Sequence, residues 1–288
     1  MDPQSPALVS VADLTVEISS PLRERRVGLR RVSLALAAGE IVTLAGETGS
    51  GNSLLAQIVG GHVDRRARRL SGSLSYEGKR ATLRRGRLTP PPRGHVATVG
   101  NGTDYPLPPD WTVGDWLGSL SRRSRTADWR DAFHAAGFVE SDELLEVSFG
   151  DLDPLSQARL GVARALLTGA RLLVSEEVER ELDPVGAATW RELLQRVRSE
   201  FGLAILHSAL SLRGIEAFAD RVLVFFEGSL LEGGDAAALA LAPRYRYTRE
   251  FLACEPRLFP PLAERPAGIS REAVREAEEA VAQGSTTG

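Results

Sequence analysis

The sequence predicts an α/β protein built on a mainly parallel β-sheet, and three observations lead to that prediction. Short apolar runs typical of buried strands alternate with helix-like stretches through most of the chain. One strand-to-helix junction, at 46–53, is rich in glycine. Between about 102 and 158, four-residue steps with Trp and Leu anchors indicate a small helical insert. We therefore expect an α/β core with an N-terminal antiparallel β piece and an inserted α-helical subdomain.

The expected elements follow one another along the chain. Apolar or alternating runs predict strands within 8–46 and at 71–78 and 95–99, with a helix at 53–61 between them. After the insert come a helix (ARLGVARALL), a strand (RLLVS), a helix (AATWRELLQRVRSE) and three strands (GLAILH, RVLVFFEG, SLLEGG). The tail from about 243 is rich in proline and predicts one helix, at 270–283, which docks on the core or on a partner.

Composition excludes several classes of function. The net charge is −3 and the pI is about 5.9, so nothing global attracts nucleic acid or an anionic membrane. A single cysteine, Cys254, excludes a disulfide framework, a four-cysteine zinc site and a cysteine-ligated iron–sulfur cluster within one chain. No apolar run reaches the length of a membrane span, and the N-terminus lacks the pattern of a signal peptide. We expect a soluble, cytoplasmic protein that does not bind nucleic acid.

The segment IVTLAGETGSGNSLL, at 41–55, carries the clearest chemical signal. An apolar strand ends at Gly46, glycines follow at Gly49 and Gly51, and a helix opens after them. Glycines let backbone N–H groups turn around an anion, and a helix N-terminus adds partial positive charge. A hydroxyl at Ser53 is where a Mg²⁺ ligand is expected. The pattern predicts a phosphate loop.

One position of this loop departs from the phosphate-binding pattern. The residue before the serine should be a lysine that reaches the phosphates, and here it is Asn52. An amide keeps a donor but loses a full charge, which costs on the order of 1.5–3 kcal/mol of binding. The chain has 34 arginines and one lysine, Lys79, which lies in an expected turn and cannot replace it.

With these motifs, about residues 8–260 resemble the nucleotide-binding subunit of an ABC transporter. GEIVTLAGETGSGNSLL resembles its phosphate loop, VGNGTDYPLPPDWTVGDWL its glutamine loop and RLLVSEEVERELDP its Walker B strand and D-loop. SFGDLDPLSQARLGVARALL occupies the signature region, AILHSALSL resembles the switch-histidine loop, and ADRVLVFFEGSLLEGG resembles the strands that close the core. The tail RYRYTREFLACEPRLFP resembles subunits of oligopeptide, dipeptide and nickel importers.

The resemblance implies a role for each matching residue. Glu177 would polarise the attacking water and His207 would contact the γ-phosphate, which makes them the catalytic candidates. Asp183 matches the D-loop aspartate, and the Mg²⁺ ligands would be Ser53, Asn101 and Glu176. The nucleotide-binding set is Gly46, Glu47, Thr48, Gly49, Ser50, Gly51, Asn52, Ser53, Leu54, Asn101 and Glu176.

Two regions depart from the family pattern. Asn101 stands at the glutamine position, one methylene shorter, and Glu176 stands where an aspartate is usual. The signature should offer a serine and two glycines to a partner's γ-phosphate, but Asp153 brings a carboxylate and Pro154 removes an N–H. The aligned residues there are Leu152, Asp153, Pro154, Leu155 and Ser156.

The resemblance implies a P-loop NTPase (RecA-like) core at 1–260, followed by a tail at 261–288 with one helix. It implies ATP and Mg²⁺ as cofactors and a second ABC ATPase subunit and transmembrane permease subunits as partners, at the inner face of the membrane. We expect an impaired half of a heterodimer, with importer-like transport of peptides, nickel or a related solute. Two alternatives stay open: an active ATPase in which an arginine compensates for Asn52, and a non-transport binding module. Trp111 and Trp116 are each candidates for core packing or for a permease contact.

Overall fold

The computed structural model describes residues 7–19, 25–63, 67–84, 87–88, 91, 94–100, 108–121, 128–139, 142–209, 212, 214–253 and 268–284.

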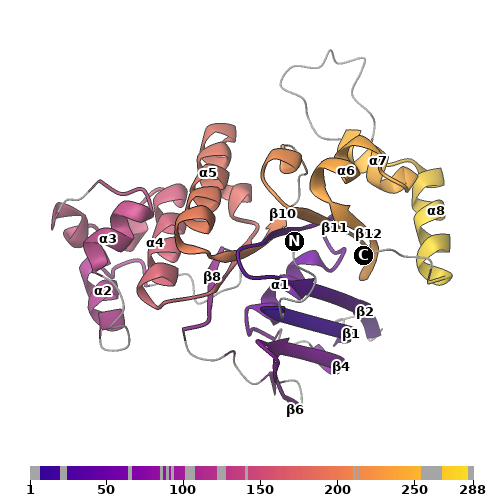
Figure 1. Ribbon diagram of the computed structural model, residues 1–288, viewed down its shortest axis with the longest axis horizontal. Helices are drawn as coiled ribbons and strands as arrows, with labels where there is room; N and C mark the ends of the chain where they lie inside the picture. Colours follow the sequence, from indigo (N-terminus) through magenta and orange to yellow (C-terminus); the bar gives the residue numbers. More distant parts are fainter. Residues whose placement is uncertain are drawn as a thin grey trace.

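Within these residues, a six-stranded sheet forms the centre of the molecule in the order β12-β11-β3-β10-β9-β8 (Figure 1). Its strands are β3 (Ile41–Ala45), β8 (Val96–Gly100), β9 (Leu172–Glu176), β10 (Ala204–Ala209), β11 (Arg221–Phe226) and β12 (Ser229–Asp235). Only β12 runs antiparallel to its neighbour among these described strands. The central strands are buried on both faces, which explains their continuous apolar runs. Ligands of such sheets bind where the parallel strands end.

An antiparallel sheet from the N-terminal part of the described chain lies against this core. Its strands are β1 (Val9–Ser19), β2 (Arg25–Leu36), β4 (Ala67–Tyr76) and β5 (Lys79–Arg80), in the order β2-β1-β4-β5. A short ribbon of β6 (Leu83–Arg84) and β7 (Arg87–Leu88) follows. The predicted antiparallel β piece is therefore present, and its inward side chains share a core with the main sheet.

Helices pack on both faces and at both ends of the six-stranded sheet. They are α1 (Asn52–Val59), α2 (Val113–Ser121), α3 (Trp129–Ala135), α4 (Pro154–Leu167), α5 (Pro184–Phe201), α6 (Ala236–Leu241), α7 (Arg246–Ala253) and α8 (Arg271–Ala282). Single 3₁₀ turns occupy η1 (Asp142–Glu146), η2 (Phe149–Asp151), η3 (Val178–Glu181) and η4 (Ile215–Ala217). Figure 1 shows α2, α3 and α4 together at one end, beside β8, and α6 to α8 at the other. The predicted helical insert, at about 102–158, contains α2 and α3, and α4 corresponds to the helix predicted to follow it.

Two hydrophobic clusters lie on opposite faces of the sheet. Successive residues of β3 alternate between them: Ile41 faces one, and Val42 and Leu44 face the other. The Val42 cluster includes α1 and the antiparallel sheet, whereas the Ile41 cluster includes α4, α5, α7 and α8. Helix α1, which follows the phosphate loop, is therefore packed between the six-stranded sheet and the antiparallel sheet.

Three glycines meet where the phosphate loop, β2 and the β11–β12 turn come together. A Cβ on Gly51 would lie 2.8 Å from the carbonyl oxygen of Gly28 and 3.2 Å from the Cα of Gly228. A Cβ on Gly228 would lie 2.9 Å from the same oxygen. The three backbones therefore touch directly, and we call this contact the glycine junction.

The predicted strands and helices recur in the structure, which also contains the unpredicted short strands β5, β6 and β7 and two unpredicted helices. The sequence did not predict α6 or α7, because the first is a short run of Ala and Leu and the second follows Pro243 in a tail read as irregular. The predicted helix at 270–283 is α8. Of the helices in the described ranges, none has both the length and the apolar character needed to cross a bilayer.

Candidate functional site

The glycine-rich loop lies between β3 and α1, at the edge where the parallel strands end. Gly49 and Gly51 have φ of 89° and 102°, in the left-handed region that favours glycine. Gly51 is the N-cap of α1, so the N–H groups of the first helical turn, which have no acceptor within the helix, face the loop. The structure brings together the predicted residues Gly46, Glu47, Thr48, Gly49, Ser50, Gly51, Asn52, Ser53 and Leu54 as one cradle.

The side chain of Asn52 is turned into this cradle and is buried. Its Oδ1 accepts hydrogen bonds from the backbone N–H of Ser53, at 2.8 Å, and from the hydroxyl of Ser50, at 3.3 Å. Its Nδ2 donates to the carbonyl of Ala209, at the end of β10, over 3.4 Å. The amide oxygen of Asn52 therefore accepts from the Ser53 N–H, a donor that a phosphate oxygen would otherwise use. The Asn52 side chain also carries no positive charge.

Two adjacent carboxylates stand at the end of β9, beside the loop. Glu176 is buried, and its Oε1 accepts a hydrogen bond from Nε2 of Gln57 at 2.6 Å. The Oε1 of Glu177 accepts from the hydroxyl of Ser53 at 2.5 Å, and its Oε2 lies 3.5 Å from the guanidinium of Arg180. Burial raises the pKa of Glu176 to about 7. The hydrogen bond from Gln57 lowers this pKa, and the negative charge of Glu177 raises it further.

The oxygens at this edge are of the type that Mg²⁺ prefers. The predicted ligands Ser53 and Glu176 both lie here, and Oε2 of Glu176 is buried without a hydrogen-bond partner, so a bound cation would satisfy it. The described residues hold no cluster of three or more His, Cys, Asp or Glu side chains that could bind a metal by itself. The residues therefore fit a Mg²⁺ ion that takes its remaining ligands from phosphates and water. The third predicted ligand, Asn101, lies outside the described residues.

His207 lies on β10 rather than after it. It pairs in register with Ser175, two residues before β10 ends at Ala209. The ring is fully buried: Nδ1 lies 3.2 Å from Oγ of Ser175, Nε2 lies 3.5 Å from Glu179, and Phe218 packs on it edge-on. The imidazole therefore points into the interior of the ligand-free chain, and its contact with a γ-phosphate stays a prediction.

A buried ionic cluster forms around this histidine. Arg191, on α5, donates two hydrogen bonds of 2.7 Å to the two carboxylate oxygens of Glu179. Burial alone would raise the pKa of Glu179, but the nearby His207 ring and the hydrogen bonds from Arg191 outweigh burial and lower the pKa to about 2. Because Glu179 is in η3, the cluster ties the segment after Glu177 to α5 and β10.

The predicted signature residues Leu152, Asp153, Pro154, Leu155 and Ser156 lie together at the start of α4. Asp153 is the N-cap: Oδ1 accepts from the backbone N–H of Ser156 at 3.0 Å, and Oδ2 accepts from its hydroxyl at 2.5 Å. Partial burial raises the pKa of Asp153, but hydrogen bonds from Ser156 and Leu155 lower it below its ordinary value. A helix start that could receive an anion is thus capped by the chain's own negative charge.

Other predicted residues have simple positions. Asp183 is the N-cap of α5, where its Oδ1 accepts from the backbone N–H of Gly186 at 2.7 Å. Lys79 is exposed in the β4–β5 hairpin, so it is not part of the phosphate loop. Cys254 lies outside the described residues.

Comparison with known proteins decides the family. A family model described as ABC transporter matches residues 29–178, just over half of the chain. The chain belongs to the ABC transporter family. A peptidoglycan transport ATP-binding protein of Agrobacterium fabrum is 29% identical over 88% of this chain, which spans 48% of that relative's length. The dipeptide transport ATP-binding protein DppD of Escherichia coli is 27% identical, with 87% of this chain and 79% of that one covered.

Two further comparisons agree with this assignment. The zinc import ATP-binding protein ZnuC of a Jannaschia species is 31% identical, over 83% of this chain and 87% of its own. The solved dimeric cassette MJ0796 matches with a TM-score of 0.64 and 17% identity, over 79% of this chain and 98% of that one. At this identity the structural match speaks for the fold alone, and it confirms the predicted α/β P-loop core with its added antiparallel sheet and helical insert.

The structure separates the two tryptophans of the ABC protein's helical insert. Trp116 is 2% exposed and packs edge-on against Phe133, with ring centroids 6.2 Å apart, so it is a core residue. Trp111 is 37% exposed. Of this pair, Trp111 is therefore the one available for a permease contact.

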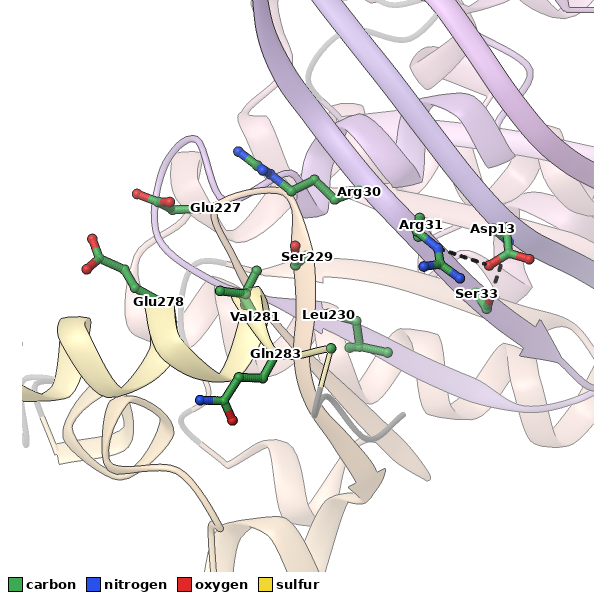
Figure 2. A pocket seen from close by; sticks show the side chains of 12 residues that line it. Asp13, Arg30, Arg31, Ser33, Glu227, Ser229, Leu230, Glu278, Val281 and Gln283 are labelled. Carbon is green, nitrogen blue, oxygen red and sulfur yellow. Dashed lines mark hydrogen bonds and ion pairs between the residues drawn. The ribbon is translucent and has the colours of Figure 1, made fainter.

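A cavity of about 750 Å³ lies away from the phosphate loop, between β1, β2, the β11–β12 turn and α8 (Figure 2). Arg30 and Arg31 of β2 face it from one side, and Glu278 of α8 faces it from the other. No residue of 46–54 is among those that line it. We therefore do not assign it to the nucleotide.

Sequence reasoning missed three residues that contact the site. Gln57 lies four residues after Ser53 on α1, so helical spacing could have indicated that it shares the face toward the acids. Arg180 follows Glu177 by three residues in η3, again a local signal. Tyr247, which donates a hydrogen bond to Glu47, gave no signal because 200 positions separate the two.

Proposed function

We propose that this chain is an impaired ATP-binding subunit of a peptide-importer type ABC transporter, paired with a more complete ATPase subunit. The observation that carries the proposal is the inward side chain of Asn52, which takes a backbone donor of the phosphate loop and supplies no charge. In this proposal the pair attaches to transmembrane permease subunits at the inner face of the membrane.

The second altered element supports the heterodimer. In the family, each nucleotide lies between the loop of one chain and the signature of the other. A homodimer would combine the Asn52 loop with the Asp153-capped helix in both sites. A heterodimer separates the two defects, so that each site keeps one intact contribution from the partner. Relatives named for dipeptide and oligopeptide transport support the peptide class of solute.

The residues that remain suit binding better than turnover. The N–H groups of the loop would contact the polyphosphate, and Ser53 and Glu176 would hold Mg²⁺, which neutralises phosphate charge when bound. Glu177 keeps a carboxylate at the position expected to orient water, held by Ser53 on one side and Arg180 on the other. Without a lysine, the loop has no positively charged side chain to stabilise the negative charge that develops on the transferred phosphate.

Co-purification with the partner subunits tests the proposal. We expect the purified chain alone to bind ATP weakly with or without Mg²⁺, and to hydrolyse it at no more than about one hundredth of the rate of the complex. Within the complex, Glu177→Gln in this chain should change turnover less than about twofold, while the matching change in the partner abolishes it. Hydrolysis by the chain alone at the rate of the complex would refute the proposal.

One contact favours a second candidate, an active subunit with a compensated loop. Arg180 is the described arginine whose guanidinium lies beside Glu177, at 3.5 Å. If Arg180 supplied the missing charge, Arg180→Ala would abolish hydrolysis by the chain alone. Arg275→Ala, which removes an exposed ion pair on α8, would not, and it serves as the matched control.

A further inference from the structure

Helix α7 reaches the phosphate loop through one side chain. The hydroxyl of Tyr247 donates a hydrogen bond of 3.1 Å to Oε2 of Glu47, the residue directly after Gly46. Glu47 itself is exposed, whereas Tyr247 is 1% exposed. A buried donor therefore holds a carboxylate that stands within the loop and is otherwise open to solvent.

The ring of Tyr247 is fixed in place. Phe226, at the end of β11, packs against it with centroids 4.9 Å apart at 69°, and Phe251 lies parallel to it at 6.1 Å. Burial, followed by the negative charge of Glu47, raises the pKa of Tyr247, so the hydroxyl keeps its proton and remains a donor.

Helix α8 in turn holds α7. Glu250 of α7 accepts hydrogen bonds from the backbone N–H of Ser270, at 2.6 Å, and from its hydroxyl, at 2.9 Å. Arg246 bridges Glu250 and Glu272 on the two helices. The stripe Ala273, Ala277 and Ala280 is buried in the main core, so α8 docks on its own chain.

Glu47 matters because of where it stands. A phosphate loop gathers N–H groups to attract anions, and a free carboxylate within it repels the same anions. The geometry points to Tyr247 as a positioning residue of the phosphate loop, which holds the Glu47 carboxylate toward α7 and keeps the cradle open to a polyphosphate. This inference rests on the proposed function in so far as the ligand is ATP.

Two single variants and their combination test it with ATP as the probe. Tyr247→Phe removes only the hydroxyl and should weaken ATP binding by about 3- to 10-fold. Glu47→Gln should bind at least as well as the wild type, because the repelling charge is gone. The double variant should bind like Glu47→Gln, because the hydroxyl then has no charge to hold. An equal loss from Tyr247→Phe in both backgrounds would overturn the inference.

Hydrogen exchange of the ligand-free chain gives a readout that does not need ATP. Tyr247→Phe should speed exchange in 46–50 by about threefold or more. Tyr76→Phe is the matched control, since it removes a buried hydroxyl that donates to the carbonyl of Val59 at 2.6 Å, outside that loop segment. If no variant binds ATP, the proposed function fails, and the exchange result still decides this inference. If residues 46–50 of Tyr247→Phe exchange at the wild-type rate, the inference is overturned.

Discussion

Replacing Asn52 by lysine puts a charge where the phosphate loop lacks one. A hydrogen bond to a charged group contributes about 1.5–3 kcal/mol, against about 0.5–1.5 for a neutral one, so the direct gain is about 1–2 kcal/mol. The change also frees the backbone N–H of Ser53 from the Asn52 oxygen, which adds one more donor for phosphate, about 0.5–1 kcal/mol. Together these gains predict ATP binding about 10- to 100-fold tighter than that of the wild type.

Calorimetric titration with ATP and Mg²⁺ measures this difference. Asn52→Ala is the control, because it frees the Ser53 N–H without adding charge, and we expect it to gain no more than about fivefold. If Asn52→Lys binds ATP within a factor of three of the wild type, the missing cation is not what limits this loop, and the reasoning from Asn52 is refuted.

Three further predictions concern stability. Asp153→Ala removes the cap of α4 and should lower the free energy of unfolding by about 0.5–2 kcal/mol, measured by urea denaturation; an unchanged midpoint would contradict the capping role. Folding lowers the pKa of Glu179 from 4.5 to about 2, so its ionised carboxylate contributes to the free energy of unfolding above pH 4.5, and this contribution is lost toward pH 2. The difference in the free energy of unfolding between wild type and Glu179→Gln should therefore shrink by about 2 kcal/mol from pH 6 to pH 3. A gap that stays constant would argue against an ionised Glu179. Trp116→Ala should cost about 3–5 kcal/mol and Trp111→Ala less than about 1, by thermal or urea unfolding, and similar costs would reverse their assignment.

Local patterns were enough to predict much of the fold. The phosphate loop needs a strand, glycines and a helix in immediate succession, and all three signals fall within 41–55. Glu176 ends a buried strand and Glu177 follows it, so their place at the sheet edge could be expected from chain order and strand direction alone. Helix α7 was missed because its residues are mostly polar, and it is stabilised by packing of Tyr247 and Phe251 on distant elements.

The buried surroundings of His207 could not be predicted from its motif. His207 follows an apolar run, as a loop residue at a strand end would, but the strand continues for two more residues through Ser208 and Ala209. Because side chains alternate with a period of two residues, this shift leaves the ring on the same face, and its burial comes from the groups packed around it, Glu179 and Phe218. The inward turn of the Asn52 side chain also could not be read from the sequence, since a rotamer depends on the donors that the fold places around it.

The glycine junction has a mechanical consequence. Gly28 belongs to the antiparallel sheet, Gly51 to the phosphate loop and Gly228 to the β11–β12 turn, and hydrogen bonds of 2.7 Å run from Gly228 N–H to Ser50 and from Arg30 N–H to Gly228. The three elements meet through main-chain atoms, so the junction holds them rigidly. Rotation of the N-terminal sheet against the loop would break main-chain hydrogen bonds. The N-terminal sheet, the phosphate loop and the β11–β12 turn are therefore expected to move together as one rigid unit in any large internal movement of this protein.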